Sequence, residues 1–222
     1  SAGELRRPGV LDAQVRRMLA APQAESLVKD FALRWLDLLE VDKFEWDKQI
    51  FAEFNAELRQ DFATEIDLFL RSILLEDKNV EELLRADYTF LNEKLARHYG
   101  ITTVRGAQFR RVRLEDENRY GLLGKGAVLL HTSYGNRTSP IVRGAWVLDK
   151  LRGTPPAPPP PNVVTDLSTP PGQAPKTMRA MLEQHRANPT CNMCHGVIEP
   201  HGLPLERFTV TGQWRDVDWQ AN

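Results

Sequence analysis

Both cysteines of the chain fall within one five-residue stretch, Cys191-Asn192-Met193-Cys194-His195. Two thiols at this spacing can add across the two vinyl groups of a haem, and the adjacent imidazole can then bind the iron. Cys-x-x-Cys-His is the attachment motif of c-type haem. The spacing therefore predicts one covalently bound haem c, with Cys191 and Cys194 as attachment sites and His195 as the proximal iron ligand.

Two other chemistries stay open for the same side chains. A zinc site needs four ligands, which the three motif residues could complete with His185 or His201, although that second pair lacks a recognisable zinc spacing. A redox-active or structural disulfide is the other alternative. A thioredoxin-like dithiol should follow a strand at the start of a βαβ unit, whereas here a polar, helical segment leads into the motif.

The motif does not specify the second axial ligand of the iron. His185 is the first candidate, because it precedes the motif closely and is separated from it by a turn. The other candidates are Met178, Met181, His201 and His131, and the position could also be vacant. A methionine ligand would raise the reduction potential relative to two histidines. Arg179, Arg186 and Arg207 could pair with the haem propionates.

The elements that must position these residues are predicted to be helices. Apolar residues recur at spacings of three and four over residues 24–41 and 57–75, which is typical of helices with one buried face. Both faces should meet in one core. Further helices are expected over 92–99, 139–152 and 177–186, and a short strand over 109–114. The apolar face over 24–41 consists of Leu27, Val28, Phe31, Trp35, Leu38 and Leu39.

The segment after the motif, 196–208, is rich in proline and glycine. This composition argues against a long helix there. We expect the segment to wrap the edge of the haem instead, because a haem needs an apolar wall that limits water access. The wall residues would be Ile198, Leu203, Leu205 and Phe208.

The fold class expected from these patterns is mainly α. Residues 1–105 should form a helical bundle domain, and residues 106–222 a second domain of helices and loops. Within the second domain, the proline run 155–161 is typical of a stiff polyproline II arm. The cytochrome c-like haem segment then occupies residues 176–222.

Bulk composition narrows the classes of function and partner. The 222 residues, 41% of them hydrophobic, can bury a substantial core. With 29 basic and 30 acidic residues the net charge is −1, which gives no indication of a nucleic-acid partner. No apolar run is long enough to predict a membrane span. Because bacterial c-type haem is attached outside the cytoplasm, we expect an exported, periplasmic or otherwise extracytoplasmic protein, and a chain that is part of a longer one.

Several stretches resemble the planctomycete-type cytochrome c proteins that carry domains of unknown function 1592 and 1588 in tandem. The first domain is indicated by Trp35-Leu36, Asp87-Tyr88-Thr89-Phe90-Leu91-Asn92-Glu93 and Leu95-Ala96-Arg97-His98-Tyr99-Gly100. The second is indicated by Arg119-Tyr120-Gly121-Leu122-Leu123, Arg137-Thr138-Ser139-Pro140, Arg143-Gly144-Ala145-Trp146-Val147-Leu148, the proline arm, and His185-Arg186 through Cys194-His195.

The resemblance covers nearly the whole chain. It implies a secreted or periplasmic protein in which the haem motif ends the second domain. One stretch departs from the family, since Glu199-Pro200-His201-Gly202 stands where an aspartate-proline-leucine-glycine stretch is usual. His201 is therefore particular to this chain, and no activity can be transferred from the family.

Together these observations predict a c-type cytochrome module that transfers single electrons within a larger extracytoplasmic protein or complex. Its partners would be a redox protein or further domains or subunits. The sequence near the motif shows no acid/base or nucleophile constellation, which favours an electron-transfer protein over an enzyme. The alternatives are a peroxidase-like haem enzyme with an open distal site, and a structural interaction subunit whose haem stabilises a small segment.

Overall fold

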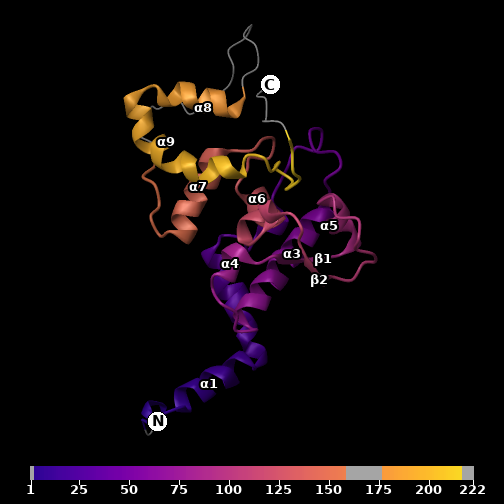
Figure 1. The fold of residues 1–222 in the computed structure, drawn as a ribbon, viewed down its shortest axis with the longest axis vertical. Coiled ribbons are helices and arrows are strands. Elements are labelled where there is room, and N and C mark those ends of the chain that lie inside the picture. The colour runs from indigo at the N-terminus through magenta and orange to yellow at the C-terminus, as the bar shows by residue number, and fades with distance from the viewer. Residues whose placement is uncertain (1–2, 159–176, 217–222) are drawn as a thin grey trace.

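The computed structural model describes residues 3–158 and 177–216, and these are mainly helical, as the sequence predicts (Figure 1). The α-helices are α1 (Val10–Leu19), α2 (Leu33–Trp35), α3 (Ala56–Leu74), α4 (Glu82–Arg85), α5 (Glu93–His98), α6 (Gly126–His131), α7 (Pro140–Trp146), α8 (Met178–Arg186) and α9 (Pro189–Gly202). Two strands, β1 (Tyr88–Leu91) and β2 (Arg110–Arg113), pair antiparallel. Short 3-10 and π-helical turns link these elements.

Helix α3 runs through the middle of the molecule and confirms the helix predicted over 57–75 (Figure 1). Asn55 caps its first turn by accepting a hydrogen bond from the Leu58 backbone N–H at 2.9 Å. The predicted apolar face is buried, with Phe62 and Phe69 fully covered. The helix therefore supplies the central wall of the core.

The helix predicted over 24–41 is only partly confirmed. A π-helical turn (Leu27–Ala32) leads into α2, which ends at Trp35, and Asp37 then adopts a left-handed φ of 59°. The expected face is confirmed at Val28 and Leu38, which are buried, but wrong at Phe31, which is 55% exposed. Ala32, Leu33 and Leu36 also pack on the core, and the pattern did not identify them. The residues of the predicted face that point outward are Leu27, Phe31, Trp35 and Leu39.

The strand expected over 109–114 is confirmed as β2, which pairs with β1 in the register Tyr88 to Arg113. Helix α5 confirms the one expected over 92–99. Asn92 caps it by accepting from the Leu95 backbone N–H at 2.8 Å, and Gly100 follows it with a φ of 79°. That left-handed conformation is the one in which glycine carries no steric penalty.

One hydrophobic cluster draws on both halves of the chain. It contains Phe62 and Ile66 of α3 together with Val128 of α6, Trp146 of α7 and Val210 near the described C-terminal end. The segments that the sequence divides at residues 105 and 106 thus share a core. Helix α7 continues as a π-helical turn (Val147–Leu151), so the helix predicted over 139–152 is confirmed.

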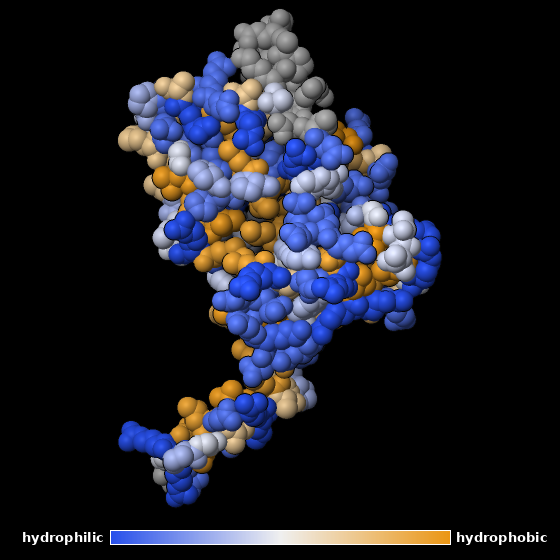
Figure 2. All heavy atoms as spheres, in the orientation of Figure 1, coloured by the Kyte–Doolittle hydropathy of each residue, from blue (hydrophilic) through white to orange (hydrophobic). Residues whose placement is uncertain are grey.

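Helix α1 projects from the end of the molecule opposite α8 and α9, and it contributes no buried residue (Figure 1). Hydrophobic side chains lie on the surface of this helix in Figure 2, and Leu11, Val15 and Met18 are exposed. Within the described ranges no helix has the length and apolar character needed to cross a bilayer. The proline arm predicted at 155–161 lies partly outside the described residues, and residues 155–158 form neither helix nor strand.

Candidate functional site

Two helices joined by a two-residue turn present the Cys-x-x-Cys-His motif. Thr177 caps α8 by accepting from the Ala180 backbone N–H at 3.2 Å, which confirms the helix predicted over 177–186. Asn188 then caps α9 by accepting from the Thr190 backbone N–H at 2.9 Å, and Pro189 occupies the first helical position. The motif thus lies in the first turns of α9.

The prediction that residues 196–208 form no long helix is wrong over their first half, because α9 continues to Gly202 through Pro200. A proline inside a helix crowds the carbonyl four residues earlier. That residue is Gly196, so the helix loses one regular turn hydrogen bond there. Tertiary contact, rather than helix propensity, holds this part of α9.

That contact is a backbone-to-backbone approach of α7 and α9. A Cβ built on Gly202 would lie 1.8 Å from the Pro140 carbonyl oxygen, and one on Gly144 would lie 2.1 Å from the Ile198 carbonyl oxygen. Only glycine permits helices to pack this closely at either position. The two glycines therefore fix the distance between the motif helix and the core.

Cys191, Cys194 and His195 stand on one face of α9. Positions i, i+3 and i+4 span an arc of about 100° on a helix with 3.6 residues per turn. Both thiols are free and half-buried, and the side chain of His195 is 20% exposed. Two thiols and one imidazole on a single helical face are the arrangement that thioether attachment and axial ligation require.

The first candidate for the distal ligand, His185, lies against His195. The two ring centroids are 4.5 Å apart with planes inclined at 57°. Burial lowers the pKa of His185, and the neighbouring His195 lowers it further, which favours the neutral imidazole. Neutral imidazole is the form that binds a metal.

A buried carboxylate contacts the Nδ1 atom of the His195 ring. Glu199, one turn along α9 and 0% exposed, lies 2.9 Å from His195 Nδ1 through its Oε1. Its Oε2 lies 2.9 Å from Nε of Arg186, the last residue of α8. Because Nδ1 is engaged by Glu199, Nε2 is the ring nitrogen left to bind a metal.

These residues fit a haem. The side chains that would attach and ligate it share one face, and the ring nitrogens of His195 already have different roles. Two imidazoles that bind opposite sides of one iron have centroids about 6 Å apart, given metal–nitrogen bonds of about 2 Å. The two ring centroids lie 4.5 Å apart, so the rings would have to separate for both to bind one iron. Among the described residues, no group of three or more His, Cys, Asp and Glu side chains is arranged to hold a bare metal ion.

The structure places the other distal candidates elsewhere. Met178 and Met181 are buried in a cluster with Leu182 that packs on Ile141 and Leu203. His201 lies 2.9 Å from Arg152 Nη1 through Nε2, and 3.0 Å from the Val197 carbonyl oxygen through Nδ1. His131 belongs to α6, and its Nε2 lies 3.5 Å from Asp37.

The apolar residues expected to line the haem edge pack on the protein instead. Ile198 contacts α7 at Gly144, and Leu203 packs on the two α8 methionines. Leu205 and Phe208 form a cluster with Leu129. These side chains therefore anchor the motif helix and the segment that follows it.

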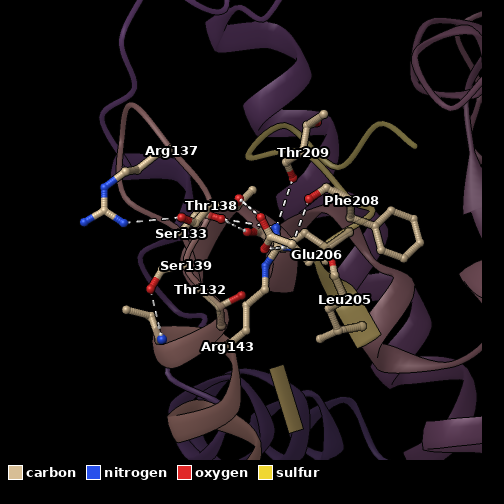
Figure 3. A network of polar contacts seen from close by, with 12 residues as sticks. Thr132, Ser133, Arg137, Thr138, Ser139, Arg143, Leu205, Glu206, Phe208 and Thr209 are labelled. Carbon is tan, nitrogen blue, oxygen red and sulfur yellow. Dashed lines mark hydrogen bonds and ion pairs between the residues drawn. The ribbon is translucent and has the colours of Figure 1, made fainter. Parts of the chain in front are cut away.

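Arg143 clamps that following segment from inside (Figure 3). Its guanidinium donates to the carbonyl oxygens of Leu205, Phe208 (2.9 Å) and Thr209 (3.1 Å), and to Ser133 Oγ (3.3 Å). The side chain is fully buried, and burial lowers its pKa to about 10, so it remains charged at neutral pH. Glu206 balances this charge, since its Oε2 lies 3.9 Å from Nη1 of Arg143.

Comparison with known families assigns both halves of the chain. Residues 1–101 match the family described as PSD4, protein of unknown function (DUF1592). Residues 119–218 match the family described as PSCyt3, protein of unknown function (DUF1588). The two matches follow one another along the chain. No curated protein and no solved structure matches it.

The residues that match DUF1588 contain the whole candidate site, including α7, α8 and α9. Sequence reasoning identified the two cysteines, His195 and His185, which the structure brings together. It missed Glu199, and it assigned Arg186 to a haem propionate rather than to a carboxylate. The signal was present as a His-x-x-x-Glu spacing, but it carries meaning only if residues 195–199 are helical.

Proposed function

We propose that this chain carries one covalently attached haem c and transfers single electrons. The single observation that carries the proposal is that Cys191, Cys194 and His195 share one face of α9, with the His185 ring 4.5 Å from that of His195. In this proposal the two cysteines attach the haem, His195 binds the iron through Nε2, and His185 binds it from the other side.

A haem bound here would supply an iron that cycles between the ferric and ferrous states. The chain's own residues determine how well the site does this. Glu199 orients the His195 ring, and the glycine contacts with α7 hold α9 in place, so the site should change little between the two states. Two histidine ligands leave no coordination position for a substrate, which suits electron transfer.

The test is production of the full chain in a bacterium that has haem-maturation machinery, followed by intact mass measurement and spectroscopy. The mass should exceed that of the polypeptide by one haem, and the reduced-minus-oxidised spectrum should have sharp α and β bands. The control is the double variant Cys191→Ala/Cys194→Ala, which should carry no covalent haem. A bare polypeptide mass for the unaltered chain would overturn the proposal, and a bound zinc ion or a disulfide would identify which alternative holds.

Ligand binding separates electron transfer from catalysis. A six-coordinate iron that binds carbon monoxide and cyanide slowly is expected, because His185 stands next to the motif histidine. Rapid binding of either ligand together with turnover of peroxide would replace the proposal with a peroxidase-like enzyme. A haem that no redox protein reduces or oxidises would indicate a structural role.

The proposal also carries a location and a class of partner. Since bacterial haem c is attached outside the cytoplasm, we place the protein in the periplasm or another extracytoplasmic compartment. Its electron donor and acceptor would be a redox protein, or further domains or subunits of a larger assembly. Fractionation of cells that express the natural protein tests this, and recovery of the haem protein from the cytoplasm would contradict it.

A further inference from the structure

We propose that Glu199 is a positioning residue that raises the electron donation of His195 and so keeps the reduction potential of the site low, and that Arg186 limits this effect. The inference rests on the proposed haem function, because it concerns the ligand that would bind the iron. It names two residues that the attachment motif does not include. Both act through His195 rather than on the haem itself.

The first step of the argument is the position of Glu199. Its side chain is 0% exposed, and its Oε1 lies 2.9 Å from His195 Nδ1. A carboxylate is expensive to bury, so it requires partners that compensate its charge. The partners here are the imidazole N–H and the Arg186 guanidinium.

The second step is the effect on the histidine. A carboxylate that accepts from Nδ1–H fixes the tautomer and the orientation of the ring, and it makes Nε2 a stronger donor to a metal. Stronger donation stabilises ferric iron relative to ferrous iron, which lowers the reduction potential. A backbone carbonyl or a water molecule at the same position would have a weaker effect, because neither carries a negative charge.

The third step concerns Arg186. Its Nε lies 2.9 Å from Glu199 Oε2, yet the two atoms are not aligned as a hydrogen bond. The pair therefore attracts by charge but withdraws less electron density from Glu199 than a directed bond would. Because Arg186 ends α8 directly after His185, the same ion pair holds His185 beside His195.

The argument gives opposite signs for the two residues. In Glu199→Gln, loss of the negative charge should reduce the ferric-to-ferrous ratio at a given potential about tenfold, which raises the midpoint potential by about 59 mV for a one-electron couple. In Arg186→Gln, Glu199 loses its counter-charge and donates more strongly to His195, so the potential should fall by a smaller amount. Matched controls are Glu183→Gln on α8 and Arg85→Gln on α4, which remove the same charges from exposed positions and should change the ratio less than about twofold.

The experiment is a potentiometric titration of the unaltered holoprotein and the four variants, after mass measurement shows one haem in each. A rise for Glu199→Gln together with a fall for Arg186→Gln, both beyond their controls, supports the inference. An unchanged or lowered potential in Glu199→Gln, or a rise equal to that of Glu183→Gln, overturns it. Absence of haem from the unaltered chain refutes the proposed function instead, so the two failures are distinguishable.

A second measurement does not depend on the variants loading haem. In the reduced, unaltered holoprotein, the Nδ1 proton of His195 should exchange slowly with solvent, because it is bonded to a carboxylate that has no solvent exposure. Nuclear magnetic resonance reports the exchange rate of this proton. A proton that exchanges as fast as that of an exposed histidine would show that Glu199 does not hold the ring, and the inference would fail.

Discussion

Replacement of Arg143 by methionine tests how the segment after the motif is held. The change keeps the length of the side chain but removes its five N–H donors. The carbonyl oxygens of Leu205, Phe208 and Thr209 would each lose a buried donor, and Glu206 would lose one of its positive neighbours. Solvent does not reach the Arg143 side chain in the folded protein, because it is 0% exposed, so no existing water contact replaces the lost donors.

The size of the effect follows from these contacts. Leaving one buried acceptor without a donor costs about 1–3 kcal/mol, and removing one partner of a buried charged pair costs about 3–5 kcal/mol. Glu206 retains Arg215, whose Nη2 lies 2.6 Å from Oε1, so the charge on Glu206 is not stranded. We therefore expect Arg143→Met to reduce the free energy of unfolding by about 3 kcal/mol, toward the lower end of the range for a broken buried pair.

Urea unfolding followed by far-ultraviolet circular dichroism measures this free energy. Arg143→Lys is the matched control, because lysine keeps the charge but its single ammonium cannot span three carbonyls, and it should recover part of the loss. Amide hydrogen exchange should accelerate in residues 203–215 more than in α3. A loss below about 1 kcal/mol in Arg143→Met, or uniform acceleration of exchange, would refute the view that this arginine clamps the segment.

Three further outcomes are expected. Burial lowers the pKa of Lys125 from 10.5 to about 8. Between pH 8 and pH 10.5 the unfolded chain therefore binds more protons than the folded one. Measured by urea unfolding, the free energy of unfolding of the unaltered protein relative to Lys125→Met should rise by about 3 kcal/mol over this range. A difference between the two proteins that does not change with pH contradicts this. Gly202→Ala should lower stability by about 1–3 kcal/mol in thermal unfolding. Gly196→Ala is the control and should not lower stability, because its Cβ would meet only the Asn192 side chain at 3.1 Å. Equal losses of stability in the two variants would count against close packing of α7 on α9. His185→Phe should convert the ferric holoprotein from low spin to high spin in its visible spectrum, and an unchanged low-spin spectrum would eliminate His185 as the distal ligand.

The sequence predicts those parts of the fold in which local pattern and burial agree. Helix α3 is one of them, because its large apolar residues are also its buried ones. The helix near residue 30 is not, because small Ala32 faces the core while large Phe31 faces solvent. Spacing alone cannot distinguish these two faces, since the choice depends on which surface the rest of the chain covers.

The candidate site divides in the same way. The attachment residues are predictable, because their order and spacing along the chain are sufficient to indicate covalent haem attachment. Glu199 is not, because its role depends on α9 being helical across Pro200, and local propensity argues against that helix. The stabilising factor is the approach of α7 at Gly144 and Gly202, which are 58 residues apart in the chain, too far for any short-range pattern to connect.

The core that the two halves share makes the stability of each half depend on the other. The Trp146 indole N–H donates to the Leu36 carbonyl oxygen at 2.9 Å, and His98 Nε2 lies 2.6 Å from the Thr211 carbonyl oxygen, so each half completes the polar contacts of the other. Neither half could be transferred to a different protein without exposing apolar surface that its partner now covers. The two halves should therefore be stable only when both are present.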